Sequence, residues 1–150
     1  MGLYDLTFYD IIKRNARCFN KRDAWFDVDA CRSTTFLEYR EKVDILAYGL
    51  KKIGIKKGER IGVLGKNSIE YFLLYGAAEA LGAIIVPVNS RLTQNEIGFN
   101  LNDCACKLVF AGKEYSQVVQ GLKESLPSWF GRQGHGQRVI RKGLTLKVKG

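Results

Sequence analysis

Long apolar runs, proline and histidine are scarce in this sequence, which has two prolines and one histidine in 150 residues. The longest strongly apolar stretch, Ala77 to Val88, is interrupted by Glu79 and Gly82. It falls well short of the roughly 20 residues that a membrane-spanning helix needs, so no transmembrane segment is predicted. The lone His135 has no evident base or nucleophile near it in the sequence, and we assign it no chemistry.

The amino terminus also lacks the pattern of a secretory signal. Its acidic residues precede its apolar positions and its basic residues follow them, which is the reverse of the order in a signal peptide. Leu6 stands where a myristoylation signal has Ser or Thr. We therefore expect a cytoplasmic protein whose cysteines are reduced thiols rather than a disulfide framework. The cysteines are Cys18, Cys31, Cys104 and Cys106.

A metal site is also not favoured. Cys104 and Cys106 could supply two thiolates, but zinc requires four ligands. Neither the pair Cys18 and Cys31, which are 13 positions apart, nor His135 completes such a set. The preferred interpretation is that small residues lead here into a buried strand.

Acidic residues are absent after residue 128. The whole chain has 24 basic and 15 acidic residues, for a net charge of +9, and Trp129–Gly150 holds six of the basic ones. Residues 1–128 therefore carry 24 − 6 = 18 basic against 15 acidic residues, a net charge of +3. We predict a folded portion over residues 1–128 and a basic, Gly-rich, irregular tail over residues 129–150. Such a tail could bind nucleic acid or an anionic membrane surface through charge alone, but it contains no RNA-binding pattern.

Hydrophobic periodicity predicts an α/β fold. The expected elements are a helix over Thr7–Phe19, a small hairpin within Ala24–Phe36, a helix over Phe36–Ile53, strands over Ile61–Leu64, Ala83–Val88 and Lys107–Ala111, a helix before Gly82, another from Thr93 to Asp103, and a last helix around Tyr115–Leu122 that ends by Pro127. From Arg60 onward this is a Rossmann-like parallel β-α-β-α-β-α half-domain, preceded by a helix, a small hairpin and a helix. The continuous apolar run Ala83–Val88 is typical of a strand that is covered on both faces.

Three of the helices have a start signal in which a capping residue precedes Glu by three positions. The three signals are Thr35–Glu38, Asn67–Glu70 and Thr93–Glu96.

The turn at Gly65 and Lys66 has the order of a strand, a phosphate loop and a helix. A P-loop would need Gly where Arg60 stands and Ser or Thr where Asn67 stands, so that motif fails. The dinucleotide-binding pattern also fails, because Gly62 and Gly65 are three positions apart and no third glycine follows. A weak phosphate site at Lys66 and Asn67 stays open, because helix N-termini attract anions. A plain capped turn is favoured, since a capping side chain already satisfies the amides there.

Several segments resemble the N-terminal region of AMP-forming acyl-CoA synthetases, the adenylate-forming superfamily that also contains luciferases and peptide-synthetase adenylation domains. The segments are "TTFLEY", "KKGERIGVLGKNSIEY" and "ALGAIIVPVNSRLTQNEI". The resemblance covers about residues 1–126, and "LYDLTFYDIIKRNARCF" is most similar to the long-chain or medium-chain fatty acid branch.

The resemblance implies ligation of a carboxylic acid to coenzyme A. In this family ATP and Mg²⁺ give an acyl-adenylate and pyrophosphate, and the CoA thiol then displaces AMP. The family's phosphate loop ending Gly-x-Pro-Lys, its Thr-Glu adenylate motif, its ribose-binding Asp segment and its C-terminal domain with a catalytic Lys have no counterpart in this sequence. We therefore expect no catalytic, cofactor-binding or metal-binding residues and no bound cofactor.

Two interpretations of the whole chain follow. The first is a truncated N-terminal fragment of such a ligase, not competent alone, whose tail after residue 128 is read in a shifted frame. The alternative is a stand-alone binding or regulatory module, which would use the half-domain as a partner surface and the basic tail as a contact to anionic partners. The acyl substrate and the oligomeric state are not encoded in any pattern that we recognise.

Overall fold

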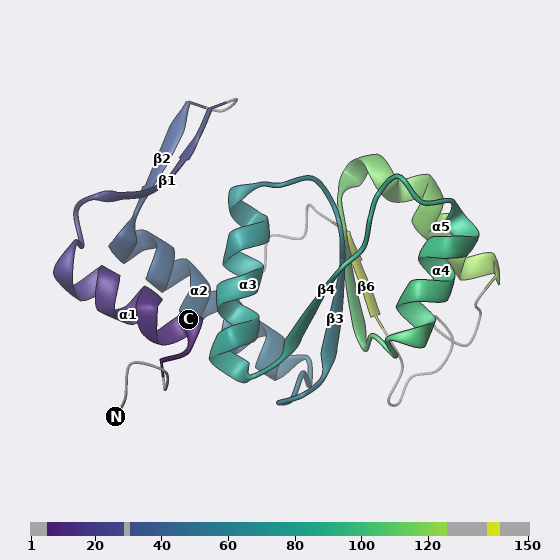
Figure 1. Ribbon diagram of the computed structural model, residues 1–150, viewed down its shortest axis with the longest axis horizontal. Helices are drawn as coiled ribbons and strands as arrows, with labels where there is room; N and C mark the ends of the chain where they lie inside the picture. Colours follow the sequence, from purple (N-terminus) through teal and green to yellow (C-terminus); the bar gives the residue numbers. More distant parts are fainter. Residues whose placement is uncertain (1–5, 29–30, 126–137, 142–150) are drawn as a thin grey trace. The chain divides into compact units, whose positions relative to one another are not determined.

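The computed structural model describes residues 6–28, 31–125 and 138–141 (Figure 1). It divides into two units. The first unit contains the described residues up to Lys56 together with Asn67–Gly82, and the second contains Lys57–Lys66 and the described residues from Ala83 onward.

The first unit is formed by three helices and a hairpin. Its elements are α1 (Phe8–Cys18), β1 (Asp23–Asp27), β2 (Arg32–Thr35), α2 (Phe36–Lys52) and α3 (Ile69–Leu81). The two strands pair antiparallel with an irregularity between Asp23 and Trp25, so the predicted hairpin is confirmed. Gly54 follows α2 with a φ of 94°, a left-handed conformation that glycine adopts without strain.

Two of the predicted helix starts are confirmed. In both Thr35–Glu38 and Thr93–Glu96 the Thr side chain accepts from the Glu backbone N–H, and the Glu carboxylate accepts from the Thr backbone N–H. A third box of this kind, Thr7–Asp10 at the start of α1, was not predicted as a box. Its carboxylate belongs to Asp, whereas the usual capping box has Glu or Gln at this position.

The predicted cap at Asn67 is wrong. Ser68 caps α3, with its hydroxyl accepting from the backbone N–H of Tyr71 at 3.3 Å. The helix begins one residue later than expected, so Glu70 is its second residue rather than its third. Either Asn or Ser can serve as a cap, and the sequence pattern alone did not discriminate between adjacent candidates.

An aromatic group centred on Trp25 joins the hairpin of the first unit to its helices. The Trp25 ring stacks on Phe72 with centroids 4.0 Å apart and meets Tyr39 edge-on at 5.7 Å. The Tyr39 hydroxyl donates to the Phe72 carbonyl at 2.8 Å, and burial raises the pKa of Tyr39 to about 12. A buried hydroxyl with a fixed acceptor specifies one packing of these rings.

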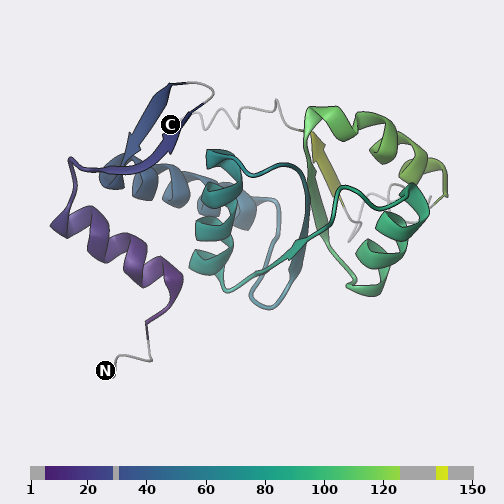
Figure 2. The same ribbon diagram turned by 45° about the horizontal axis from the view of Figure 1, so that its top comes forward.

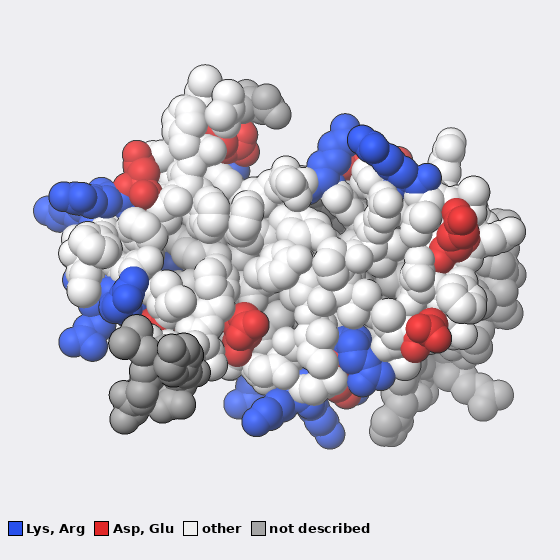
Figure 3. Space-filling model, in the orientation of Figure 1, with Lys and Arg blue, Asp and Glu red and all other residues white. Residues whose placement is uncertain are grey.

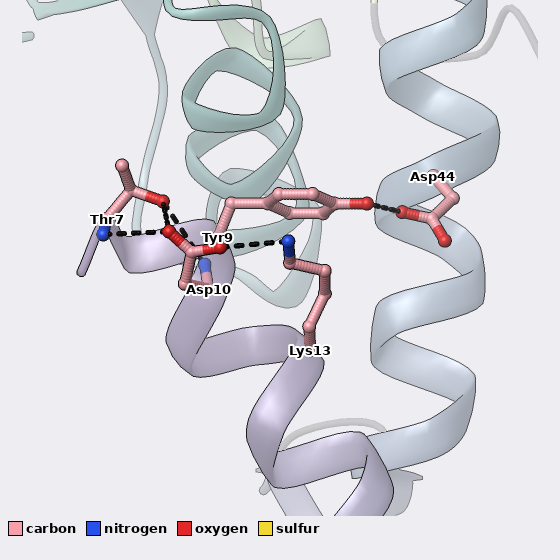
Figure 4. Close-up of polar contacts among 5 residues, drawn as sticks. All are labelled: Thr7, Tyr9, Asp10, Lys13 and Asp44. Carbon is pink, nitrogen blue, oxygen red and sulfur yellow. Dashed lines mark hydrogen bonds and ion pairs between the residues drawn. The ribbon is translucent and has the colours of Figure 1, made fainter. Parts of the chain in front are cut away.

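Polar contacts fasten α1 to its own start and to α2 (Figure 4). The Tyr9 hydroxyl donates to Asp44 Oδ1 at 2.6 Å, which links α1 to α2. Asp10 accepts from the Thr7 backbone N–H at 3.0 Å and pairs with Lys13 at 2.8 Å. These contacts are mostly solvent-exposed, so we attribute to them orientation of the helix more than large stability.

The second unit is built on a four-stranded, fully parallel sheet. Its strands are β3 (Arg60–Leu64), β4 (Ile84–Pro87), β5 (Leu108–Ala111) and β6 (Arg138–Arg141), in the order β4-β3-β5-β6. The helices α4 (Gln94–Asp103) and α5 (Ser116–Ser125) follow β4 and β5, and the short 3₁₀ helix η2 (Lys113–Tyr115) precedes α5. The two α-helices lie together beside the sheet (Figures 1 and 2).

The core of the second unit lies between the sheet and these helices. The predicted inward residues of α4, Ile97 and Leu101, are each 1% exposed and pack with Val109 of β5. A Cβ added at Gly62 would lie 2.5 Å from Leu101 Cδ2, so β3 needs glycine there for the helix to approach.

The expectation that the run Ala83–Val88 is covered on both faces is wrong. β4 is an edge strand, and Ile84 is 50% exposed while Pro87 is also exposed. The continuous apolar pattern is typical of strands whose two faces are both covered, whereas Ile84 and Pro87 of β4 are exposed. Among the described residues β4 also has a single neighbouring strand, β3.

The expectation of an irregular tail does not hold at Arg138–Arg141, which form β6. This strand pairs in parallel with β5, with Val139 opposite Val109. Two consecutive β-branched residues favour a strand, and β5 would otherwise end the ladder on that side. His135 lies outside the described residues.

Candidate functional site

The carboxyl ends of β3 and β5 are the place where this topology can hold a ligand. From β3 the chain passes to β4 on one side and then returns to β5 on the other, so a topological switch point lies between β3 and β5. Open parallel sheets bind ligands in the crevice outside the carboxyl ends of their strands at such a point. The two ends meet where the Gly112 backbone N–H donates to the Leu64 carbonyl at 2.8 Å.

The residues after β5 do not form an anion cradle. Gly112 is extended, with a φ of −60°, and a Cβ added there would lie 2.7 Å from Glu114 Oε2. The Glu114 carboxylate therefore folds back over the glycine that follows the strand. A negative group at this position opposes the binding of a phosphate, even with Lys113 beside it in the sequence.

The residues after β3 form a capped turn. The Ser68 hydroxyl already accepts from the Tyr71 backbone N–H, as described above. A Cβ added at Gly65 would have no atom within 4 Å, so this glycine is not required for a close approach. The weak phosphate site at Lys66 and Asn67 stays a prediction, and the favoured capped turn is present.

The cysteines near β5 are structural. Cys106 is fully buried, and burial raises the pKa of its thiol to about 11, so it is a poor nucleophile. Arg60 at the start of β3 donates from Nε to the Cys104 carbonyl at 2.8 Å and from Nη2 to the Ala105 carbonyl at 3.4 Å. The guanidinium thus satisfies carbonyls at the C-terminal end of α4, where Ala105 has a φ of 46°.

The other two cysteines, Cys18 and Cys31, are exposed free thiols. Within residues 6–28, 31–125 and 138–141, no group of three or more His, Cys, Asp or Glu side chains could hold a metal ion. The same ranges contain no helix that is both long and apolar enough to cross a membrane.

A shallow hollow lies on the outer side of α4, and no motif in the sequence predicted it. Its volume is about 440 Å³, and it is lined by Leu92, Asn95, Glu96, Phe99 and Asn100. The Glu96 carboxylate is bonded to Thr93 within the capping box, at 2.7 Å to the backbone N–H and 2.8 Å to the hydroxyl. Those bonds lower the pKa of Glu96 and keep it ionised, so the hollow contains no acid/base couple. The sequence feature that could have indicated this hollow is Phe99, an aromatic residue on the polar side of α4 whose side chain is 70% exposed.

The strand order and the strand-to-helix turns define a Rossmann-like parallel α/β half-domain. The chain belongs to the AMP-binding enzyme family, whose model matches residues 12–143. The match continues beyond the end of the resemblance near residue 126 and includes β6.

Several curated relatives of the chain are acyl-CoA ligases. It is 26% identical over 135 residues to the long-chain-fatty-acid–CoA ligase FadD13 of Mycobacterium tuberculosis, covering 86% of this chain and 27% of that protein. It is 30% identical over 127 residues to the mitochondrial medium-chain acyl-CoA ligase ACSF2 of Rattus norvegicus, covering 83% and 21%. It is 41% identical over 109 residues to the acyl-CoA ligase SID4 of Ajellomyces capsulatus, covering 73% and 18%. The chain thus spans about a fifth to a quarter of the length of these relatives.

Solved structures give the same result. A protein of Rhodopseudomonas palustris CGA009 assigned to the long-chain-fatty-acid CoA ligases matches with a TM-score of 0.81 and 37% identity, over 95% of this chain and 34% of that one. The fatty acyl CoA synthetase of Mycobacterium tuberculosis matches with a TM-score of 0.78 and 25% identity, over 90% and 26%. The predicted family and the predicted fold class are therefore confirmed.

Proposed function

We propose that the chain is an N-terminal fragment of an ATP-dependent, AMP-forming ligase that joins a fatty or other carboxylic acid to coenzyme A. The observation that supports this proposal is the family match over residues 12–143, taken with the small share of each ligase that the chain covers. The cytoplasmic location of the chain stays a prediction.

We further propose that the chain alone cannot complete adenylation. Transfer of an adenylyl group needs preorganised donors around the phosphates of ATP. The residues that follow β5 do not fit that task, because the Glu114 carboxylate lies over Gly112. We derive no catalytic step through ATP or Mg²⁺ for this chain, whose residues serve instead to build the scaffold.

An acyl-CoA assay tests this proposal. The purified 150-residue chain is incubated with a fatty acid, ATP, Mg²⁺ and CoA, and acyl-CoA is measured by mass spectrometry. We expect no product above a protein-free control. FadD13 of Mycobacterium tuberculosis, assayed in parallel, is the positive control. ATP-dependent formation of acyl-CoA by the chain itself would overturn the claim of incompetence.

The boundary at residue 128 and the shifted reading frame also remain proposals. The family match to residue 143 favours a departure point nearer that residue than 128. Sequencing of the coding DNA is the test. A ligase frame that resumes downstream supports the fragment, and a single frame under purifying constraint contradicts it.

The alternative is a binding module that contacts anionic partners through its tail. It is supported by the six basic residues and the absence of acids in residues 129–150. On the face shown in Figure 3, by contrast, basic and acidic side chains are interspersed, and no field of one sign covers the described part. Salt-sensitive nucleic-acid binding that is lost on deletion of residues 129–150 would favour the module.

A further inference from the structure

We propose that the hollow on the outer side of α4 is a docking site for an arginine side chain on a peptide segment of a partner protein. The inference goes beyond the proposed ligase function and does not depend on it. Three observations carry it: the lining residues share one helical face, the Glu96 carboxylate is held in place with an oxygen to spare, and the surrounding segment contains no cation.

The lining residues lie on one face of α4 and on the turn before it. They recur three and four positions apart, the spacing that makes residues neighbours on a helix surface. They are Leu92, Asn95, Glu96, Phe99 and Asn100. The opposite face of α4 is buried in the core through Ile97 and Leu101, each 1% exposed, so the hollow faces outward. The Phe99 side chain is 70% exposed and offers its ring to a ligand.

The Glu96 carboxylate is ionised and fixed in position. Both of its bonds from Thr93 end on Oε2, at 2.7 Å from the backbone N–H and 2.8 Å from the hydroxyl. These bonds lower the pKa of Glu96 and hold the side chain against the start of the helix. The other oxygen, Oε1, can therefore accept a hydrogen bond from a ligand without disturbing the cap.

The charge around the hollow favours a cationic ligand. Residues 92–106 contain two acids, Glu96 and Asp103, and no Lys, Arg or His, although the net charge of the chain is +9. The flanking cations, Arg91 and Lys107, are not among the residues that line the hollow. An anion would be repelled by Glu96, and a wholly apolar ligand would cover polar side chains without bonding to them.

A guanidinium fits the lining groups better than an ammonium does. Its planar face can stack on the exposed ring of Phe99. Its N–H groups lie in the same plane and can reach the Glu96 carboxylate and the side-chain oxygens of Asn95 and Asn100. An ammonium is a compact, strongly hydrated charge without a planar face. Because the site is shallow and exposed, we expect one arginine to bind with a dissociation constant on the order of a millimolar.

The experiment titrates the isotope-labelled 150-residue chain with short peptides and follows the amide resonances of α4 by NMR. The probe is acetyl-Gly-Arg-Gly-amide, and two matched peptides carry citrulline or lysine in place of the arginine. Glu96→Gln removes the charge and keeps the cap, since Gln also serves at this position of a capping box. Phe99→Leu removes the ring. Asp103→Asn removes an equal charge from the same helix outside the hollow and is the control.

We expect the arginine peptide to give saturable shifts, and the citrulline and lysine peptides to bind at least about threefold more weakly. Glu96→Gln and Phe99→Leu should each weaken binding of the arginine peptide by at least about threefold, whereas Asp103→Asn should change it less than about 1.5-fold.

Three results would overturn the inference: no saturable shift below about 10 mM peptide, equal binding of the citrulline or lysine peptide, or equal effects of Glu96→Gln and Asp103→Asn. So would a dimer of this chain that Glu96→Gln dissociates, because the occupant of the hollow would then be a second copy. None of these readouts involves catalysis. Acyl-CoA formation by the isolated chain would therefore overturn the proposed function and leave this inference standing.

Discussion

The contacts that stabilise the first unit internally differ in kind from those that stabilise the second. In the first unit, side chains from the hairpin and two helices meet in an aromatic group in which Tyr39 also bonds to the Phe72 carbonyl. In the second unit, the core packs against a ladder of parallel strands, and among the residues that the structure describes this ladder ends at β4, where Ile84 is exposed. The side chains of the aromatic group contact one another, whereas the backbone N–H and C=O groups along the edge of a sheet can pair with a further strand. The first unit therefore depends mainly on packing between side chains, and the second depends mainly on backbone pairing in a sheet together with the helices packed on it.

The largest effect is expected in the core of the second unit. Leu101→Ala removes a side chain that is 1% exposed, and we expect a loss of about 2–5 kcal/mol in the free energy of unfolding. Phe99→Ala on the same helix removes a side chain that is 70% exposed and should change it by less than about 0.5 kcal/mol. Urea denaturation measures both. Similar losses for the two variants would mean that α4 does not pack as described.

The next largest effect on the free energy of unfolding is expected where side chains pack closely against a glycine, and each unit contains one such glycine. Gly62→Ala forces a Cβ to 2.5 Å from Leu101 Cδ2 in the second unit and should cost about 1–3 kcal/mol. In the first unit, Gly76→Ala places a Cβ 2.7 Å from Val43 Cγ2. Alanine also raises the helix propensity by up to about 1 kcal/mol, which offsets part of the cost of this close contact.

Gly65→Ala is the control for both glycine variants, because a Cβ there meets nothing within 4 Å. We expect it to be close to neutral in the same denaturation experiment. If Gly65→Ala cost as much as Gly62→Ala, steric approach of α4 to β3 would not explain the glycine.

A smaller effect is expected at the contact between α1 and α2. Tyr9→Phe removes the 2.6 Å hydrogen bond to Asp44 and should lower the free energy of unfolding by about 1 kcal/mol. Tyr48→Phe, at a ring that is 50% exposed, is the matched control and should have no measurable effect. Thermal unfolding of the two variants discriminates between them, and equal melting temperatures would argue against the Tyr9 contact.

The smallest effect is a pH dependence at the start of α1. The ion pair with Lys13 and the bonds from Thr7 lower the pKa of Asp10 from 3.8 to about 2. A carboxyl with a lowered pKa in the folded state stabilises the fold fully above its unfolded value, and that contribution disappears as the pH falls from about 4 through 2. We expect Asp10→Asn to flatten the decline in melting temperature over this range. An unchanged decline would show that Asp10 is not paired in solution.

Local signals in the sequence predicted most of the fold because they depend on neighbouring residues. Thr35 and Glu38 form their capping box within one turn of helix, and Ile97 and Leu101 occupy one face at helical spacing. The exposure of β4 could not be predicted this way, because an apolar run does not say which parts of the protein cover the two faces of the strand. β6 was missed for a related reason, since its pairing with β5 joins segments far apart in a region rich in glycine and arginine.

The candidate site was harder to predict than the fold. The sequence excluded a P-loop at Lys66, but the carboxylate of Glu114 over Gly112 depends on how a side chain folds back after β5. The hollow beside Phe99 likewise depends on which side of α4 faces solvent.

The most direct test of the central claim, that this chain has the family's fold without its chemistry, is fatty-acid-dependent exchange of labelled pyrophosphate into ATP by the purified chain. This exchange reports adenylation alone and needs no CoA. We predict no exchange above the rate without fatty acid, while a full-length ligase such as FadD13 exchanges under the same conditions. Exchange that depends on both the fatty acid and this chain would contradict the account.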